Sequence, residues 1–157
     1  MSTSILIKKI LVPIDGSDLS FKAPSNALHL AKMENADLSA LNVVEDINQG
    51  GSIGLKAKYG NVSFVDAFRK VRKESAEQSI SKIELDAKNQ GVAIRGEILD
   101  DEDNSSESGV ITEYADKNNF DLIVRESKGR SKLRRLLTEG LANVVVNNAK
   151  TLVLVVR

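Results

Sequence analysis

The chain has no cysteine and a single histidine, His29, among its 157 residues. The lack of cysteine excludes disulfides, thiolate metal sites and thiol catalysis. One histidine argues against both a Ser-His-Asp triad and a metal centre built from several histidines. Its position between Leu28 and Leu30 is instead typical of a partly exposed helix residue. The sequence therefore predicts no catalytic residue and no metal site.

Long apolar runs and an excess of one charge are also missing. No stretch approaches the roughly 20 apolar residues of a membrane span, and the apolar start is too short and too basic for a signal peptide. Lysine and arginine total 22, as do aspartate and glutamate, so the formal net charge is zero. Nothing global attracts nucleic acid or an anionic membrane. We expect one soluble cytoplasmic domain over residues 1–157, long enough to bury roughly two thirds of its unfolded surface.

Apolar runs of strand length alternate with helical patterns along the whole chain. Strands are expected at 10–14, 37–45, 92–99, 122–124 and 152–156, helices at 20–34, 65–90, around 110–115 and at 133–145, and a polar insert at 46–63. Such alternation predicts an α/β fold, a doubly wound five-stranded parallel sheet with helices on both faces, Rossmann-like, in strand order 3-2-1-4-5. Ligands of such sheets bind beyond the carboxyl ends of the strands, where the strand order reverses.

Two segments resemble the universal stress protein family. VPIDGSDLS, residues 12–20, resembles its first strand and Asp-Gly-Ser turn, and DLIVRESKGRSKLRRLLTEGLANVVVNNAKTLVLVVR, residues 121–157, resembles its closing strand, loop, helix and strand. The element order matches over the whole chain. The resemblance implies a five-stranded sheet, a homodimer often made by pairing of the last strands, and ATP or AMP binding in one subset of members, whereas another subset lacks nucleotide.

The phosphate motif of the nucleotide-binding subset is degraded in this chain. That motif is Gly-x-x-Gly, nine residues, then Gly-Ser or Gly-Thr. In the resemblance its four positions fall on Glu126, Gly129, Glu139 and Gly140, so one is retained. Glycine allows close backbone approach to phosphate, whereas a glutamate at ~6 Å and an effective dielectric of ~20 repels each phosphate charge by roughly 3 kcal/mol before screening. Lys128, Arg130 and further cations up to residue 135 could offset this, and the sequence leaves that competition open.

The residues expected near adenine and ribose match the family's pattern better than those of the phosphate motif do. Asp15 matches the acidic residue near the base and ribose, Pro13 and Ile14 precede it, and Val43 matches a backbone contact after the second strand. Asp15 could equally close an Asx turn. The candidate nucleotide-binding residues are Pro13, Ile14, Asp15, Val43, Glu126, Lys128, Gly129, Arg130, Ser131 and Gly140.

Several of these residues have simpler interpretations. A helix entry capped by Ser131 is favoured over phosphate binding at Gly129 to Ser131. The basic residues after it alternate with leucines as a solvated helix face would, without interleaved aromatics, so RNA binding is disfavoured. The acidic run at 100–103 lacks the spacing of an EF-hand, and a solvated loop is favoured over a cation site.

The last strand predicts self-association. Its residues are uninterruptedly apolar, and as an outer strand it would leave an unpaired edge, which pairing across a two-fold axis would cover; they are Leu152, Val153, Leu154, Val155 and Val156. The sequence thus favours a homodimeric, non-catalytic regulatory or stress-adaptation module with weak or lost ATP binding, no required cofactor and a protein partner yet to be identified. The alternative is an ATP- or AMP-binding switch that uses Asp15, Val43, Gly129 and the basic turn, and a slow ATPase ranks last.

Overall fold

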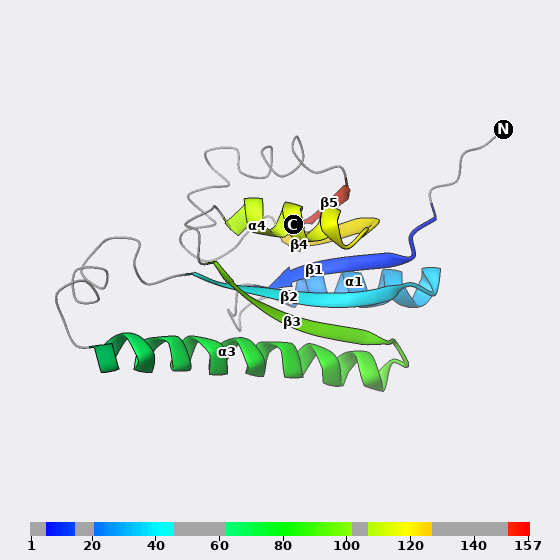
Figure 1. Ribbon diagram of the computed structural model, residues 1–157. Helices are drawn as coiled ribbons and strands as arrows, with labels where there is room; N and C mark the ends of the chain where they lie inside the picture. The colour runs from blue at the N-terminus through cyan, green and yellow to red at the C-terminus, as the bar shows by residue number, and fades with distance from the viewer. Residues whose placement is uncertain (1–5, 15–20, 46–61, 102–106, 127–150) are drawn as a thin grey trace.

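The parallel sheet of the computed structural model has the strand order β3-β2-β1-β4-β5, with β1 at its centre (Figure 1). The structure describes residues 6–14, 21–45, 62–101, 107–126 and 151–157. Both the fold class and the strand order predicted from the sequence are confirmed. The described elements are β1 (Lys9–Ile14), α1 (Lys22–Glu34), β2 (Asp37–Glu45), α3 (Val62–Asn89), β3 (Ile94–Asp101), α4 (Glu107–Lys117), β4 (Leu122–Glu126) and β5 (Leu152–Val156).

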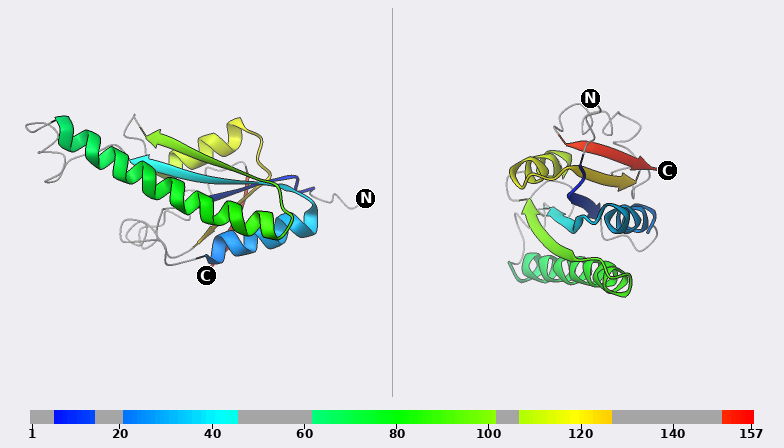
Figure 2. Two further views of the ribbon diagram at one scale, coloured as in Figure 1. Left: turned by 90° about the horizontal axis from the view of Figure 1, so that it is seen from below. Right: turned by 90° about the vertical axis from the view of Figure 1, so that its right-hand side faces the viewer.

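Two apolar layers cover the sheet, and Figure 2 shows α1 and α3 on one face and α4 on the other. Alternate residues of each strand enter opposite layers, which explains why the central strands are apolar almost throughout. The α1/α3 layer contains Ile10, Val12, Ala27, Leu28, Leu38, Ala40, Ile83, Ala87, Leu122 and Val124. The α4 layer contains Leu11, Leu41, Ile111, Ala115, Phe120 and Ile123.

The three described helices end in the same way. Asn35, Gly91 and Asn119 each adopt a positive φ, at 54°, 71° and 56°. The next residue then donates its N–H to the carbonyl of an alanine five positions earlier: Ala36 to Ala31, Val92 to Ala87 and Phe120 to Ala115, at 2.9, 2.8 and 3.0 Å. These are the bonds of a Schellman-type ending, which asparagine or glycine can adopt at little cost.

This ending explains one difference from the sequence prediction. The third strand was expected at 92–99, but β3 runs from Ile94 to Asp101. Val92 is buried, yet its N–H completes the end of α3 and is not part of the sheet. The predicted helix at 133–145 and most of the insert at 46–63 lie outside the described residues, and α3 begins within the insert's last two positions.

Gly96 lets α3 pack closely on β3. A Cβ atom at this position would lie 2.2 Å from Ile80 Cγ2, well inside van der Waals contact. Any side chain here would force the helix away from the strand, at a cost typical of overpacked cores. The glycine therefore fixes the distance between α3 and the outer part of the sheet.

In the described part of the chain, no helix combines the length and the apolar composition needed to cross a bilayer.

Tyr114 joins α4 to the outer strand β3. Its ring stacks on Phe120 with centroids 5.8 Å apart. Burial, together with a hydrogen bond to the Glu97 side chain, raises the pKa of the Tyr114 hydroxyl to about 12. The folded protein thus favours the neutral phenol more strongly than the unfolded chain does.

This shift predicts a specific alkaline instability. An unfolded tyrosine titrates near ~10, so the contribution of Tyr114 is complete below that pH and is lost as the pH rises toward about 12. We expect the unfolding free energy, measured by urea denaturation, to fall less steeply over this range in Tyr114→Phe than in the wild type. Equal slopes in the wild type and Tyr114→Phe would contradict this role.

Candidate functional site

The candidate site lies at the carboxyl ends of β1 and β4. From β1 the chain order runs outward through β2 on one side and through β4 on the other, so the strand order reverses between β1 and β4. Crevices of open parallel sheets form at such a reversal. Pro13 and Ile14 end β1, Glu126 ends β4, and Val43 lies near the end of β2.

The four described candidate residues reach the site from both faces of the sheet. All of them are partly buried. Ile14 packs against the α1/α3 layer, whereas Val43 packs against the α4 layer. Pro13, beside Leu41 in the sheet register, alternates with Ile14 and points to the opposite face. Pro13, Ile14 and Val43 thus lie near the carboxyl ends of β1 and β2 on opposite faces of the sheet, and their role in binding adenine stays a prediction.

The remaining candidates are not described by the structure. Asp15, Lys128, Gly129, Arg130, Ser131 and Gly140 lie outside the described residues, so their roles stay predictions.

The Glu126 carboxylate caps helix α1. Its Oε1 accepts a hydrogen bond from the Ala23 backbone N–H at 3.0 Å, although the two residues are 103 positions apart. Ala23 is the second residue of α1, whose own N-cap, Phe21, makes no side-chain cap bond, and the first turn of the helix has no acidic residue. The carboxylate therefore satisfies an N–H group that the helix leaves open and faces the positive end of the helix dipole.

The sequence pattern assigned Glu126 only one effect, to weaken phosphate binding by replacing a glycine of the phosphate motif. The structure adds a stabilising role, because the Glu126 side chain connects the end of β4 to the start of α1. Glu126 ends β4 four residues after Leu122, just as Ile14 follows Ile10, and Ile10 and Leu122 are register partners. The Glu126 carboxylate thus lies on the α1 face of the sheet, at the carboxyl end of β4 next to β1.

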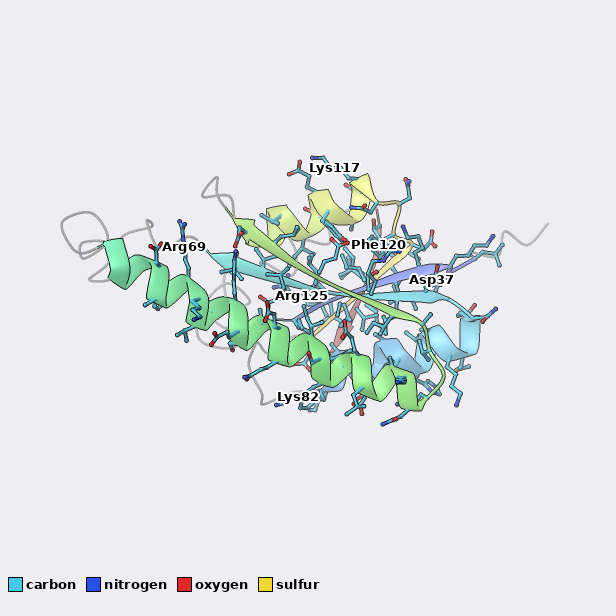
Figure 3. The ribbon with its side chains drawn as sticks, turned by 60° about the horizontal axis from the view of Figure 1, so that its bottom comes forward. Asp37, Arg69, Lys82, Lys117, Phe120 and Arg125 are labelled. Atoms are coloured by element: carbon cyan, nitrogen blue, oxygen red, sulfur yellow. The ribbon has the colours of Figure 1, made fainter. Side chains whose placement is uncertain are left out.

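Two buried polar residues near this edge were not singled out by the sequence. Asn42 is 5% exposed and pairs in register with Ile14, and Arg125 is 8% exposed one position before Glu126. Arg125 alternates with Glu126 and so belongs to the α4 face of β4, and Figure 3 labels it within the sheet. In the sequence, the sign that Asn42 and Arg125 are buried is that each is a polar residue within an apolar strand.

Within the described ranges, no group of three or more metal-ligating side chains occurs. Asp100, the first of the acidic run, instead forms an ion pair with Lys73 on α3 at 3.4 Å. The side chain of His29 is exposed on α1, as the sequence predicted.

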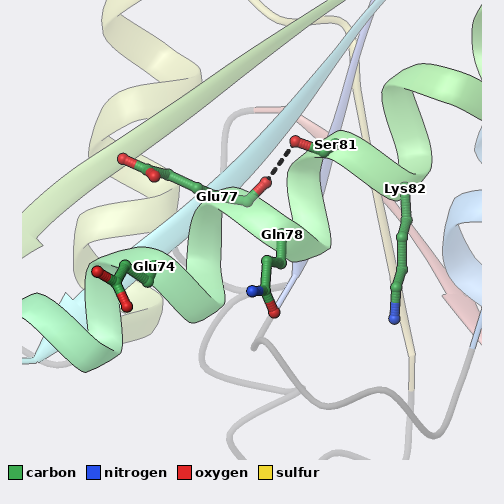
Figure 4. A pocket seen from close by; sticks show the side chains of 5 residues that line it. All are labelled: Glu74, Glu77, Gln78, Ser81 and Lys82. Atoms are coloured by element: carbon green, nitrogen blue, oxygen red, sulfur yellow. Dashed lines mark hydrogen bonds between the residues drawn. The ribbon is translucent and has the colours of Figure 1, made fainter.

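A shallow hollow on α3 is not a plausible alternative site. Figure 4 shows that all of its lining side chains come from this one helix, and Ser81 donates a hydrogen bond to the Glu77 carbonyl at 2.8 Å. Side chains from a single exposed helix face cannot enclose a ligand. The lining residues are Glu74, Glu77, Gln78, Ser81 and Lys82.

The fold and the position of the site define an α/β protein of the doubly wound class, with its candidate crevice at the strand-order reversal. The sequence profile of the Universal stress protein family matches residues 6–157, and the chain belongs to this family. It is 34% identical over 152 residues to Universal stress protein MJ0531 of Methanocaldococcus jannaschii, covering 97% of this chain and 83% of the relative.

Solved structures of the family share the fold. Universal stress protein UspA from Lactobacillus plantarum superposes with a TM-score of 0.76 at 24% identity, covering 96% of this chain and 97% of that one. A universal stress protein in complex with cAMP superposes with a TM-score of 0.66 at 21% identity, covering 97% of this chain and 98% of that one.

The capping bond predicts a loss of stability when Glu126 is truncated. Glu126→Ala should lower the unfolding free energy by roughly 0.5–2 kcal/mol, the range measured for lost N-caps. Glu126→Gln should lose less, because its amide oxygen can still accept from Ala23. Urea denaturation measures both, with Glu77→Ala on the exposed face of α3 as the matched control. An Ala variant as stable as this control would show that the cap contributes nothing.

Proposed function

We propose that this universal stress protein is a homodimeric, non-catalytic stress-adaptation module of the cytoplasm. It acts through its surface on a protein partner and binds adenine nucleotides weakly or not at all. The observation that supports this best is the placement of Glu126. Its carboxylate is held by the Ala23 N–H at the strand-order reversal, where a bound nucleotide would have to bring its phosphates close.

The charge of Glu126 disfavours phosphate more than it disfavours adenosine. At ~6 Å and an effective dielectric of ~20, each phosphate charge is repelled by roughly 3 kcal/mol, about a hundredfold in affinity before screening. The hydrogen bond to Ala23 keeps the carboxylate from swinging away. Adenine and ribose carry no charge and are not repelled in this way.

A second function remains supported, an ATP- or AMP-binding switch. Pro13, Ile14 and Val43 lie near the carboxyl ends of β1 and β2, and the relative solved in complex with cAMP has the same fold. In this alternative, Asp15 contacts the base or ribose, and Gly129 with the basic turn compensates for Glu126.

The two functions differ in how affinity depends on phosphate. In calorimetry on the wild type, AMP and adenosine should bind nearly as well as ATP, if any of them binds. Glu126→Gln removes the charge but keeps an acceptor for Ala23, so it should raise ATP affinity at least tenfold relative to adenosine. The triple variant Glu126→Gly, Glu139→Gly, Gly140→Ser should gain at least as much.

The outcomes that contradict the first function are equally specific. A hundredfold preference of the wild type for ATP, lost in Arg130→Ala, would show a working phosphate site and favour the switch. Near-stoichiometric ATP in mass spectrometry of the purified, denatured protein would do the same. An unchanged ATP-to-adenosine ratio in folded Glu126→Gln would mean that this charge is not the obstacle.

The homodimer is supported by the outer strand β5. In the described part of the chain it has a strand neighbour on one side only, β4. Leu152, Leu154 and Val155 are 46%, 40% and 38% exposed, which is high for residues of an apolar strand. Unpaired apolar edges are normally covered, and a two-fold copy of the same strand can cover this one.

Pairing through β5 predicts that proline substitutions weaken the dimer. Val153→Pro or Val155→Pro removes a backbone donor from the strand, so the dimer dissociation constant should rise in analytical ultracentrifugation. Circular dichroism checks that each variant is folded. The control is Val71→Ser on α3, because a proline at that position would break the helix. A folded wild-type chain that is monomeric at micromolar concentration would refute this arrangement.

A further inference from the structure

Helix α3 extends well beyond the sheet that it covers. It has 28 residues, and its amino-terminal part projects past the carboxyl ends of β2 and β3 in both Figure 1 and Figure 2. Over residues 66–89, where the burial of α3 is described, the buried positions are Ala76, Ile80, Ile83 and Ala87, which face the sheet. Between residues 66 and 75, Phe68 is partly buried and the other side chains are exposed.

The sheet-facing stripe of α3 changes character where the sheet ends. One turn before Ala76 the stripe continues with Lys73, and one turn further with Arg69. Lys73 still reaches the sheet through its ion pair with Asp100, in which both side chains are about half exposed, 50% and 48%. Figure 3 shows Arg69 toward the amino-terminal end of the helix. On this face of α3, charged side chains therefore take the place of the buried apolar ones.

Cations are concentrated where α3 leaves the sheet. Arg69, Lys70, Arg72 and Lys73 are all exposed, and no acidic residue interrupts them. Apolar surface lies among them, because Val71 is 62% exposed. The Arg72 guanidinium lies 5.9 Å from the centroid of the Phe68 ring. We call residues 68–73 the basic overhang.

Acidic neighbours limit the size of the partner surface. Asp66 precedes the basic overhang and Glu74 and Glu77 follow it, all exposed on the same helix. The cationic part is five residues long, about 7.5 Å at ~1.5 Å per residue. A nucleic acid backbone or an anionic bilayer would extend onto these carboxylates and be repelled by them. A short acidic segment would not.

We infer that the basic overhang docks a partner protein through a short acidic segment that also carries an apolar side chain. The carboxylates of that segment pair with Lys70 and Arg72, and its apolar side chain covers Val71 and Phe68. This inference rests on the proposed function, a module that acts on a protein partner, and it assigns the surface used. Such charge pairs at an exposed site set specificity and the rate of association more than raw affinity.

The test uses a fluorescein-labelled peptide in which glutamates alternate with leucines, titrated with the full-length protein and followed by fluorescence anisotropy. The wild type should bind it, with affinity that falls as salt rises. Lys70→Glu together with Arg72→Glu should weaken binding at least tenfold. Lys82→Glu with Lys88→Glu makes the same change of net charge on the sheet-covered half of α3 and should stay within about twofold of the wild type.

Three results would overturn the inference: no binding by the wild type, an equal loss in both double variants, or tighter binding of single-stranded RNA or phosphatidylserine vesicles than of the peptide. Circular dichroism on each variant confirms that α3 is folded. Dimer mass and the ATP-to-adenosine ratio, measured on the same variants, report on the proposed function separately. A failure of the docking surface is thereby distinguished from a failure of the nucleotide or dimer proposals.

Discussion

The architecture depends on one constraint, that neighbouring parallel strands can be connected only by a crossover that returns the chain to the same edge of the sheet. Each crossover helix must therefore stop and reverse at a defined point. In this chain α1, α3 and α4 do so with a shared local pattern, an alanine, three residues, an asparagine or glycine with positive φ, and an apolar residue. Because the next strand starts one or two residues later, this ending also sets where β2, β3 and β4 begin.

Strand β4 is held at both ends by carboxylates. Asp121, just before β4, accepts hydrogen bonds from the backbone N–H groups of Lys8 and Lys9, each at 2.9 Å. Glu126, at its other end, accepts from Ala23 of α1. The two acids attach β4 to β1 at the amino edge of the sheet and to α1 at the carboxyl edge. These side-chain bonds add to the parallel backbone pairing of β4 with β1, which sets the spacing of the two strands.

Most of the fold could be predicted because its signals are local: apolar runs of strand length, helical periodicity and turn residues such as Gly91. The family resemblance also named Pro13, Ile14 and Val43, which lie near the carboxyl ends of β1 and β2, whereas their part in nucleotide binding stays a prediction. The cap of α1 could not be predicted, because its acceptor, Glu126, lies 103 residues from Ala23 and no local pattern connects them. The burial of Arg125 was hidden for a similar reason, since an arginine at the end of a strand is ordinarily exposed.

The close contact at Gly96 has a consequence for the far end of α3. Ile80 of α3 packs on β3 at this glycine, so the contact sets how closely the helix approaches the strand. If the helix tilts slightly at this contact, its amino-terminal end is displaced more than the contact itself, because the displacement grows with distance from it. Gly96 therefore influences the position of the basic overhang without touching it.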